Sequence, residues 1–286
     1  MRFVNIRAVC EAGGTINEDS CSVSERHLLA IDGASGLYGL RLIQTDMDGS
    51  DAAWLARRGA EEYGRRLESS DAPLQILCLE TARLLGEEFC RQTDGSEDPE
   101  TQPSSGLVAL RLREDRLEYY TLGDLTILLR FRDGRVDVIH DRAVTDLDNK
   151  VLREMVRLAE EHGESVAAQR EKVQKMLQRH RELRNREGGY MCFDLTAAGA
   201  DKGIAGDFPA NDVETVALLS DGIADAVPVY KMAPDYAALL SRLETEGPAA
   251  VVAALRQLQR KDPGFDRFPR FKMGDDVTVV LADIGG

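Results

Sequence analysis

The stretch Leu28-Leu29-Ala30-Ile31-Asp32-Gly33 is an apolar, β-type run that stops in an aspartate and a glycine. Two other runs meet acidic residues in the same way, Leu218-Leu219-Ser220-Asp221-Gly222 and Asp275-Asp276-Val277-Thr278-Val279. A fourth acidic group, Asn17-Glu18-Asp19, precedes the first run. Carboxylates at strand ends repel one another unless cations lie between them, and Mg²⁺ and Mn²⁺ prefer such oxygen ligands. The pattern therefore predicts a metal-dependent hydrolase.

Composition narrows the possible partners. The 286 residues suffice for one large domain or two small ones, and a hydrophobic share of 43% is enough for a substantial core. The formal charge of −14 argues against binding to nucleic acid or to an anionic membrane surface, since both are themselves negative. We therefore expect a globular protein with no nucleic-acid and no membrane partner.

Cysteine usage and hydropathy indicate the compartment. The five cysteines are an odd number without C-x-x-C spacing, so neither a zinc site nor a disulfide framework is expected. The N-terminus has no long apolar segment, and no stretch of 18 or more apolar residues follows. These features predict a cytoplasmic protein in a reducing compartment.

Strands and paired helices alternate along the chain. Apolar runs predict strands at 3–9, 20–31, 190–195, 213–219 and 277–283, and residues 106–140 are typical of a β-meander with turns at Glu114-Asp115, Gly123-Asp124 and Asp133-Gly134. Amphipathic spacing predicts helices at about 50–68, 71–90, 147–185, 234–245 and 248–259. Segments 33–49 and 93–104 are expected to be loops. Helical pairs between groups of strands favour an α+β fold with antiparallel sheets covered by helical hairpins.

The acidic motifs resemble those of the metal-dependent serine/threonine protein phosphatases of type 2C, in their bacterial form. The resemblance spans nearly the whole chain and keeps the order of the motifs. Its parts are Asn17-Glu18-Asp19-Ser20, Ala30-Ile31-Asp32-Gly33, Ser105-Gly106 with Leu122-Gly123-Asp124, Leu218-Leu219-Ser220-Asp221-Gly222-Ile223-Ala224-Asp225, and Gly274-Asp275-Asp276-Val277-Thr278-Val279.

This resemblance implies a single domain over residues 1–286. Its fold would be a two-sheet antiparallel β-sandwich flanked by helical pairs, in α-β-β-α layers, with a flap-like helical insert at 147–187. Its activity would be hydrolysis of phosphoserine and phosphothreonine in proteins by a metal-bridged hydroxide. The expected cofactors are two Mn²⁺ or Mg²⁺ ions, possibly with a third, because paired divalent ions lower the pKa of water and neutralise phosphoryl oxygens.

The resemblance also implies a role for each acidic residue. Asp32 would bridge the two ions, and Asp32, Asp221 and Asp275 would be the catalytic set. The carbonyl of Gly33 and the side chain of Glu18 would serve the second ion, where glycine lets the backbone approach closely. The remaining carboxylates would hold a third ion or lie around the ligands, namely Asp19, Asp124 and Asp225.

Two positions depart from the family pattern. Many relatives carry a phosphate-binding arginine four residues before the glutamate of the first motif, where this chain has Gly14. The second motif continues Gly33-Ala34-Ser35-Gly36 and lacks the histidine that some relatives use as a general acid. We expect Arg270 or Lys272, just before Asp275, to bind phosphate instead.

Three questions stay open at this point. The insert has seven Lys and Arg residues between 170 and 186 against Glu171 and Glu182, which indicates either a docking surface or an ordinary solvated helix face. The departures also leave two alternatives to a protein phosphatase. One is a weak or inactive phosphatase-like binding module, and the other is a phosphoesterase acting on small molecules. The sequence does not indicate the oligomeric state.

Overall fold

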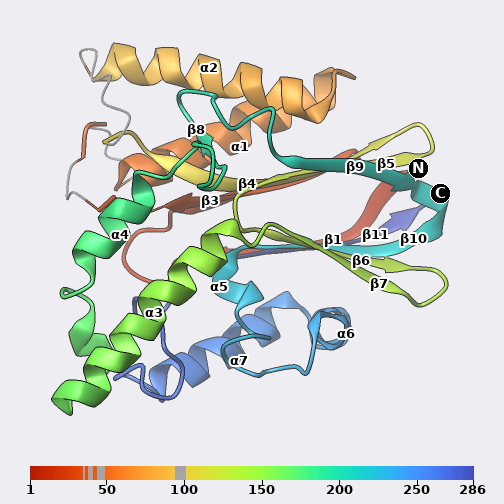
Figure 1. Ribbon diagram of the computed structural model, residues 1–286. Coiled ribbons are helices and arrows are strands. Elements are labelled where there is room, and N and C mark those ends of the chain that lie inside the picture. Colours follow the sequence, from red (N-terminus) through yellow and green to blue (C-terminus); the bar gives the residue numbers. More distant parts are fainter. Residues whose placement is uncertain (35, 38–40, 44–48, 94–100) are drawn as a thin grey trace.

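Two antiparallel sheets lie face to face in the computed structural model, which describes residues 1–34, 36–37, 41–43, 49–93 and 101–286 (Figure 1). One sheet has the strand order β1-β11-β10-β6-β7, and the other has the order β2-β3-β4-β5-β9 with β8 paired to β4. The strands of the first sheet are β1 (Arg2–Glu11), β6 (Thr126–Phe131), β7 (Val136–His140), β10 (Val213–Leu219) and β11 (Val277–Gly285). The strands of the second are β2 (Asp19–Val23), β3 (His27–Ala34), β4 (Ser104–Arg113), β5 (Arg116–Leu122), β8 (Phe193–Asp194) and β9 (Ile204–Pro209).

The central strands are buried on both faces, which explains their continuous apolar runs. In β3, Leu28 and Ala30 pack into the core between the sheets, whereas Leu29 and Ile31 pack under helices on the outer face. Successive strand side chains point to opposite faces, so a strand covered on both sides needs apolar residues at every position. The run that opens at Leu28 therefore marks an inner layer of the sandwich.

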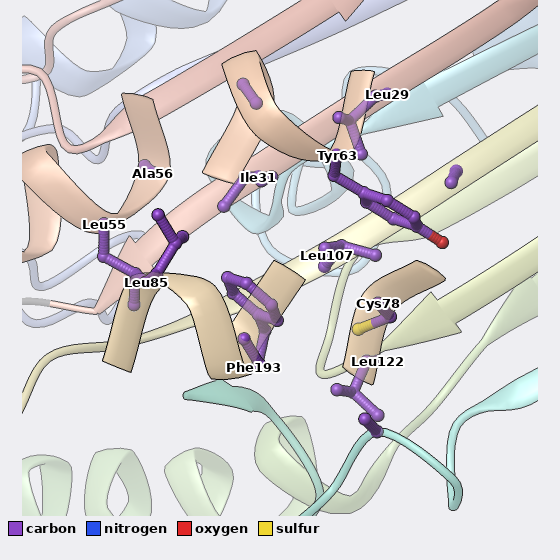
Figure 2. Packing of buried hydrophobic residues seen from close by; sticks show 14 of the residues in the cluster. Leu29, Ile31, Leu55, Ala56, Tyr63, Cys78, Leu85, Leu107, Leu122 and Phe193 are labelled. Atoms are coloured by element: carbon purple, nitrogen blue, oxygen red, sulfur yellow. The ribbon is translucent and has the colours of Figure 1, made fainter. Parts of the chain in front are cut away.

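A pair of helices covers each outer face. The helices α1 (Asp51–Ser69) and α2 (Leu74–Gln92) lie on the sheet that contains β3, as Figures 1 and 2 show. On the other sheet lie α6 (Tyr236–Glu246) and α7 (Pro248–Arg260). Side chains cap two of these helices, because Ser50 accepts from the N–H of Ala53 and Asp235 accepts from that of Ala238. The predicted α+β fold with two flanked antiparallel sheets is confirmed.

Two of the predicted strand assignments were wrong. Residues 20–31 form a hairpin of β2 and β3 rather than one strand, since the N–H of Ser24 donates to the carbonyl of His27 at 2.8 Å. The predicted meander is divided between the sheets, because β4 and β5 belong to one and β6 and β7 to the other. Gly123, with φ of +89°, lies in the short link that crosses between them.

The edge strand β9 was not predicted. Its burial is low over nearly all of Ile204–Pro209, and it contains Gly206 and Pro209, so it lacks the apolar alternation that marks a half-buried strand. Parts of the two predicted loops, including Ser35, lie outside the described residues.

The helical insert is broken into shorter elements than expected. Helix α3 (Ala143–His162) begins before residue 147 and ends at Gly163, whose φ of 64° is the left-handed conformation that favours glycine. A 3₁₀ turn, η1 (Ala167–Gln169), and the short helix α4 (Gln174–Arg181) follow. The insert has a hydrophobic cluster of its own, formed by Val151, Met155, Ala159, Val166, Val173 and Phe265. In Figure 1, α3 and α4 lie across the end of the sandwich near α5 (Asp221–Ala224).

No helix in the described part of the chain is both long enough and apolar enough to cross a bilayer. The side chain of Arg111 on β4 is fully buried. Its guanidinium donates to the carbonyls of Ser70 and Ala72 at 2.8 and 2.9 Å and pairs with Glu118 at 2.7 Å. These contacts fix the link between α1 and α2 to the sheet.

We expect Arg111→Ala to lower the free energy of unfolding by roughly 3 kcal/mol, because it removes a fully buried guanidinium and leaves two partly buried carbonyl oxygens and Glu118 without their donor. The matched control is Arg113→Ala, since Arg113 pairs with the same Glu118 at 3.0 Å but is 43% exposed. That control should cost less than about 1 kcal/mol. Urea unfolding of both variants measures the difference, and equal losses would contradict this role for Arg111.

Candidate metal centre

Three strand ends bring aspartates to one edge of the sandwich. Asp32 lies on β3, Asp221 begins α5 one residue after the end of β10, and Asp275 lies two residues before β11. The strands β10 and β11 pair side by side, and their ends are joined by the N–H of Thr278 donating to Ser220 Oγ at 2.8 Å. All three aspartates line one cavity of about 280 Å³.

Glycines allow the motifs to pack at backbone contact. A Cβ atom on Gly33 would lie 2.4 Å from the carbonyl oxygen of Glu18, and one on Gly222 would lie 2.0 Å from that of Asp276. Real Cβ atoms do not approach so closely, so both positions require glycine for space rather than for backbone torsion. The Asp-Gly pairs are thus explained by packing between segments far apart in the sequence.

Asp276 holds the first acidic motif in place. Its two carboxylate oxygens accept from the N–H groups of Gly13 and Glu18, both at 2.7 Å. Such charge-assisted bonds are stronger than neutral ones. The residue after the predicted ligand Asp275 therefore connects the beginning of the chain to its last strand.

Burial and mutual repulsion raise the pKa values of these carboxyl groups. Burial is the main cause for Asp32 and Asp221, whose pKa values lie well above the ordinary range, and neighbouring aspartates add to it. The same two causes raise the pKa of Asp124 to about 6 and that of Asp225 to about 7. A divalent cation would reverse this effect, because it stabilises the charged carboxylates.

Several oxygen atoms at this edge have no hydrogen-bond donor among the described residues. They are Oδ1 of Asp221, both carboxylate oxygens of Asp19 and Oγ of Ser105. Buried acceptors without a donor are costly, and a hard cation is the partner that aspartate oxygens suit. Within the described ranges, however, no three His, Cys, Asp or Glu side chains lie close enough to coordinate a single ion. The carboxylates face one another across the cavity and fit divalent ions by their chemistry, without forming a closed ligand cage.

The predicted acidic and glycine site residues, with Lys272, divide into three groups. Lining the cavity are Asp32, Gly33, Asp124, Asp221, Lys272 and Asp275. Asp225 borders an adjoining cavity of about 90 Å³ together with Asp124 and Asp221. Glu18 and Asp19 do not line either cavity. The carboxylate of Glu18 accepts from Ser50 Oγ at 2.6 Å, and Asp19 stands opposite Asp32 in the register of β2 and β3.

The two basic residues predicted to bind phosphate lie in different surroundings. Arg270 is buried, and its guanidinium donates to Asp262 Oδ2 at 2.8 Å and to the carbonyls of Phe268 and Gln259. Those contacts hold Arg270 in a buried network, and it borders the adjoining cavity that Asp221 and Asp225 also line, so a role in phosphate binding stays a prediction. Lys272 lines the cavity, where its Nζ lies 2.6 Å from Asp275 Oδ1.

Sequence reasoning missed the residues that the insert brings to this cavity. They are Asp148 from α3 together with Arg170, His180 and Arg181 from the segment that ends with α4. Helical spacing could have indicated Asp148, because it precedes the buried Val151 by three residues and the buried Met155 by seven. It therefore shares the apolar face of α3, where a carboxylate is unusual.

The fold and the ordered acidic strand ends define a class of phosphatase, and comparison of sequences identifies it. Residues 9–259 match the family described as Protein phosphatase 2C, and the chain belongs to this family. No curated protein sequence matches the chain significantly.

Solved structures of bacterial phosphatases have a similar fold. The serine/threonine phosphatase PstP/Ppp of Mycobacterium tuberculosis is 16% identical, with a TM-score of 0.58 over 99% of this chain and 100% of that one. Stp1 of Staphylococcus aureus is 15% identical, with a TM-score of 0.55 over 100% of this chain and 96% of that one. The catalytic domain of PstP in complex with two manganese ions is 18% identical, with a TM-score of 0.53 over the full length of both chains.

Proposed function

We propose that this protein hydrolyses phosphoserine and phosphothreonine in other proteins and depends on Mn²⁺ or Mg²⁺. The observation that carries the proposal is the meeting of Asp32, Asp221 and Asp275, from three separate strand ends, in one cavity. Membership of the protein phosphatase 2C family supports the reaction, and a similar structure that contains two manganese ions supports the cofactor.

The chain's own residues would bind the ions and the substrate. Asp32 would hold both ions, with Asp221 and Asp275 on one and the carbonyl of Gly33 on the other. Asp124 and Asp225, at the adjoining cavity, are the candidates for a third ion. When bound, paired divalent ions neutralise phosphoryl charge and lower the pKa of water. Lys272, at 2.6 Å from Asp275, would orient that carboxylate.

The direct test is release of phosphate from phosphoserine and phosphothreonine peptides by purified protein. We expect turnover with Mn²⁺ or Mg²⁺, loss of turnover with excess EDTA, and recovery when Mn²⁺ is restored. Hydrolysis that EDTA leaves unchanged would contradict the metal-dependent reaction. No phosphopeptide hydrolysis, in a protein that Mn²⁺ nevertheless stabilises, would favour the binding module instead.

A substrate panel separates the proposal from a small-molecule phosphoesterase. Nucleotides and sugar phosphates should be hydrolysed with much lower kcat/KM than phosphopeptides, because the proposed substrate contributes contacts on both sides of the phosphorylated residue. A preference for a small phosphate ester over every phosphopeptide would contradict a protein substrate.

A further inference from the structure

The first acidic motif offers no cation for the phosphate of a substrate. Gly14 occupies the position where many relatives have an arginine, and a Cβ atom there would have no neighbour within 4 Å. Nothing at that position reaches toward a phosphate group. A phosphate dianion next to this many carboxylates needs positive charge from elsewhere in the chain.

The insert brings such a charge into the cavity. Arg181 is the last residue of α4, and it lines the cavity together with Asp32, Asp221 and Asp275. Its Nη1 donates to Ser104 Oγ at 2.8 Å, which ties the end of the insert to the first residue of β4. Figure 1 shows α4 close to the ends of β3 and β4.

The sheet register relates the residue that holds this arginine to Asp32. Gly106 on β4 pairs with Asp32, and Ser104, which holds Arg181, pairs with Ala34. Two residues along a strand span about 7 Å, since each contributes roughly 3.4 Å. Directly paired residues, and residues two apart on one strand, point to the same face, so Ser104, which accepts from Arg181, lies on the same face of the sheet as Asp32.

The other basic residues near the cavity have different roles. Arg170 Nη1 donates to Gln174 Oε1 at 2.7 Å, within the insert itself. Lys272 pairs with Asp275, and Arg270 lies in the structural network beneath the site. Arginine also suits phosphate better than lysine, because its planar guanidinium donates two parallel hydrogen bonds.

We propose that Arg181, carried into the cavity by α4 of the insert, binds the phosphate group of the substrate. This inference rests on the proposed phosphatase function and names a residue that would recognise its substrate. It gives the insert a part in substrate binding.

The test compares Arg181→Ala and Arg181→Lys with Arg179→Ala, an exposed arginine two residues earlier on the same helix. Inorganic phosphate is the probe, and calorimetry in the presence of Mg²⁺ measures its Kd. For Arg181→Ala we expect phosphate to bind about 10- to 100-fold more weakly, the usual effect of losing a charge-assisted hydrogen bond. Arg181→Lys should fall between the wild type and Arg181→Ala, because it keeps the charge without the paired donors.

Two further measurements exclude a merely structural effect. The rise in melting temperature caused by Mn²⁺ should be the same in Arg181→Ala as in the wild type, because Arg181 is not an ion ligand. For p-nitrophenyl phosphate, Arg181→Ala should raise KM more than it lowers kcat.

The outcomes separate this inference from the proposed function. Weaker phosphate binding by Arg181→Ala, with no hydrolysis by any form, would support Arg181 and contradict the phosphatase activity. Hydrolysis and phosphate binding that match the wild type in Arg181→Ala would overturn the inference and leave the activity intact. Failure of the wild type to bind phosphate at all would also overturn it.

Discussion

Asp32→Asn is expected to lower metal-dependent hydrolysis by roughly 1,000-fold, which corresponds to about 4 kcal/mol of activation free energy. Asp32 lies on β3 in the wall of the cavity, between the other acidic strand ends, and it is the candidate ligand for both ions. An asparagine has the same shape but lacks the negative charge that holds two cations together. Steady-state kinetics with a phosphopeptide and Mn²⁺ measures the loss.

The same variant should have a higher melting temperature than the wild type in EDTA. Burial and the nearby Asp19 and Asp221 raise the pKa of Asp32, so its ionised form destabilises the folded chain at neutral pH. The uncharged amide removes that repulsion. In addition, Mn²⁺ should stabilise Asp32→Asn less than the wild type, because one ligand to the ions is weakened.

Asp115→Asn is the matched control, because Asp115 is an exposed aspartate in the turn between β4 and β5. It should leave turnover, melting temperature and the response to Mn²⁺ unchanged. Full activity in Asp32→Asn would contradict the proposed ion-binding role. A loss of stability in EDTA would mean that the carboxylate has a structural partner instead.

The layers of the fold could be predicted from the sequence because the central strands are buried on both faces. Leu28 to Ile31 alternate between two cores, and this made the run continuous in apolar residues. The edge strand β9 could not be predicted in this way, because most of its side chains are exposed and pack into neither core. The passage of the chain from one sheet to the other at Gly123 could not be predicted either. A short turn has the same sequence pattern whether it joins two strands of one sheet or strands of different sheets.

The acidic strand ends could be predicted because each carboxylate adjoins an apolar run. What lies opposite them could not, because the insert reaches the cavity through tertiary packing alone. Arg181 is one of several basic residues in its segment, and nothing in the sequence separates it from Arg179. Arg270 was singled out by its nearness to Asp275 in the sequence, but the contacts of its guanidinium with Asp262 and the neighbouring carbonyls could not be predicted, because they too depend on tertiary packing.

The carboxyl group of Asp148 gives a second large effect, on the pH dependence of stability. Burial first, then the nearby Asp124 and Asp225, raise the pKa of Asp148 to about 7, while Arg181 acts in the opposite direction. Asp275 lies further along the same wall and adds to the repulsion. The group therefore keeps its proton in the folded chain at a pH where the unfolded chain has lost it.

The sign of the effect follows from proton binding. Between about pH 4 and pH 7 the folded state binds more protons than the unfolded state, so the free energy of unfolding falls as pH rises through this range. For a pKa that rises from 3.8 to about 7, the full loss is about 4 kcal/mol for the metal-free protein above pH 7. We expect Asp148→Asn to remove most of this slope and to be more stable than the wild type at pH 7.5 in EDTA.

Urea unfolding in EDTA at several pH values between 4 and 8 measures this slope. The matched control is Asp146→Asn, an exposed aspartate two residues earlier on α3, which should follow the wild type. The buried His27 and His140 act in the opposite direction, because burial lowers their pKa values and the stability they give is lost as pH falls below about 6.5. Their contribution is the same in every variant, so the difference between Asp148→Asn and the wild type isolates one carboxyl group. Parallel curves for these two proteins would show that Asp148 ionises freely, and would contradict the effect of burial and of the nearby Asp124 and Asp225 on this carboxyl group.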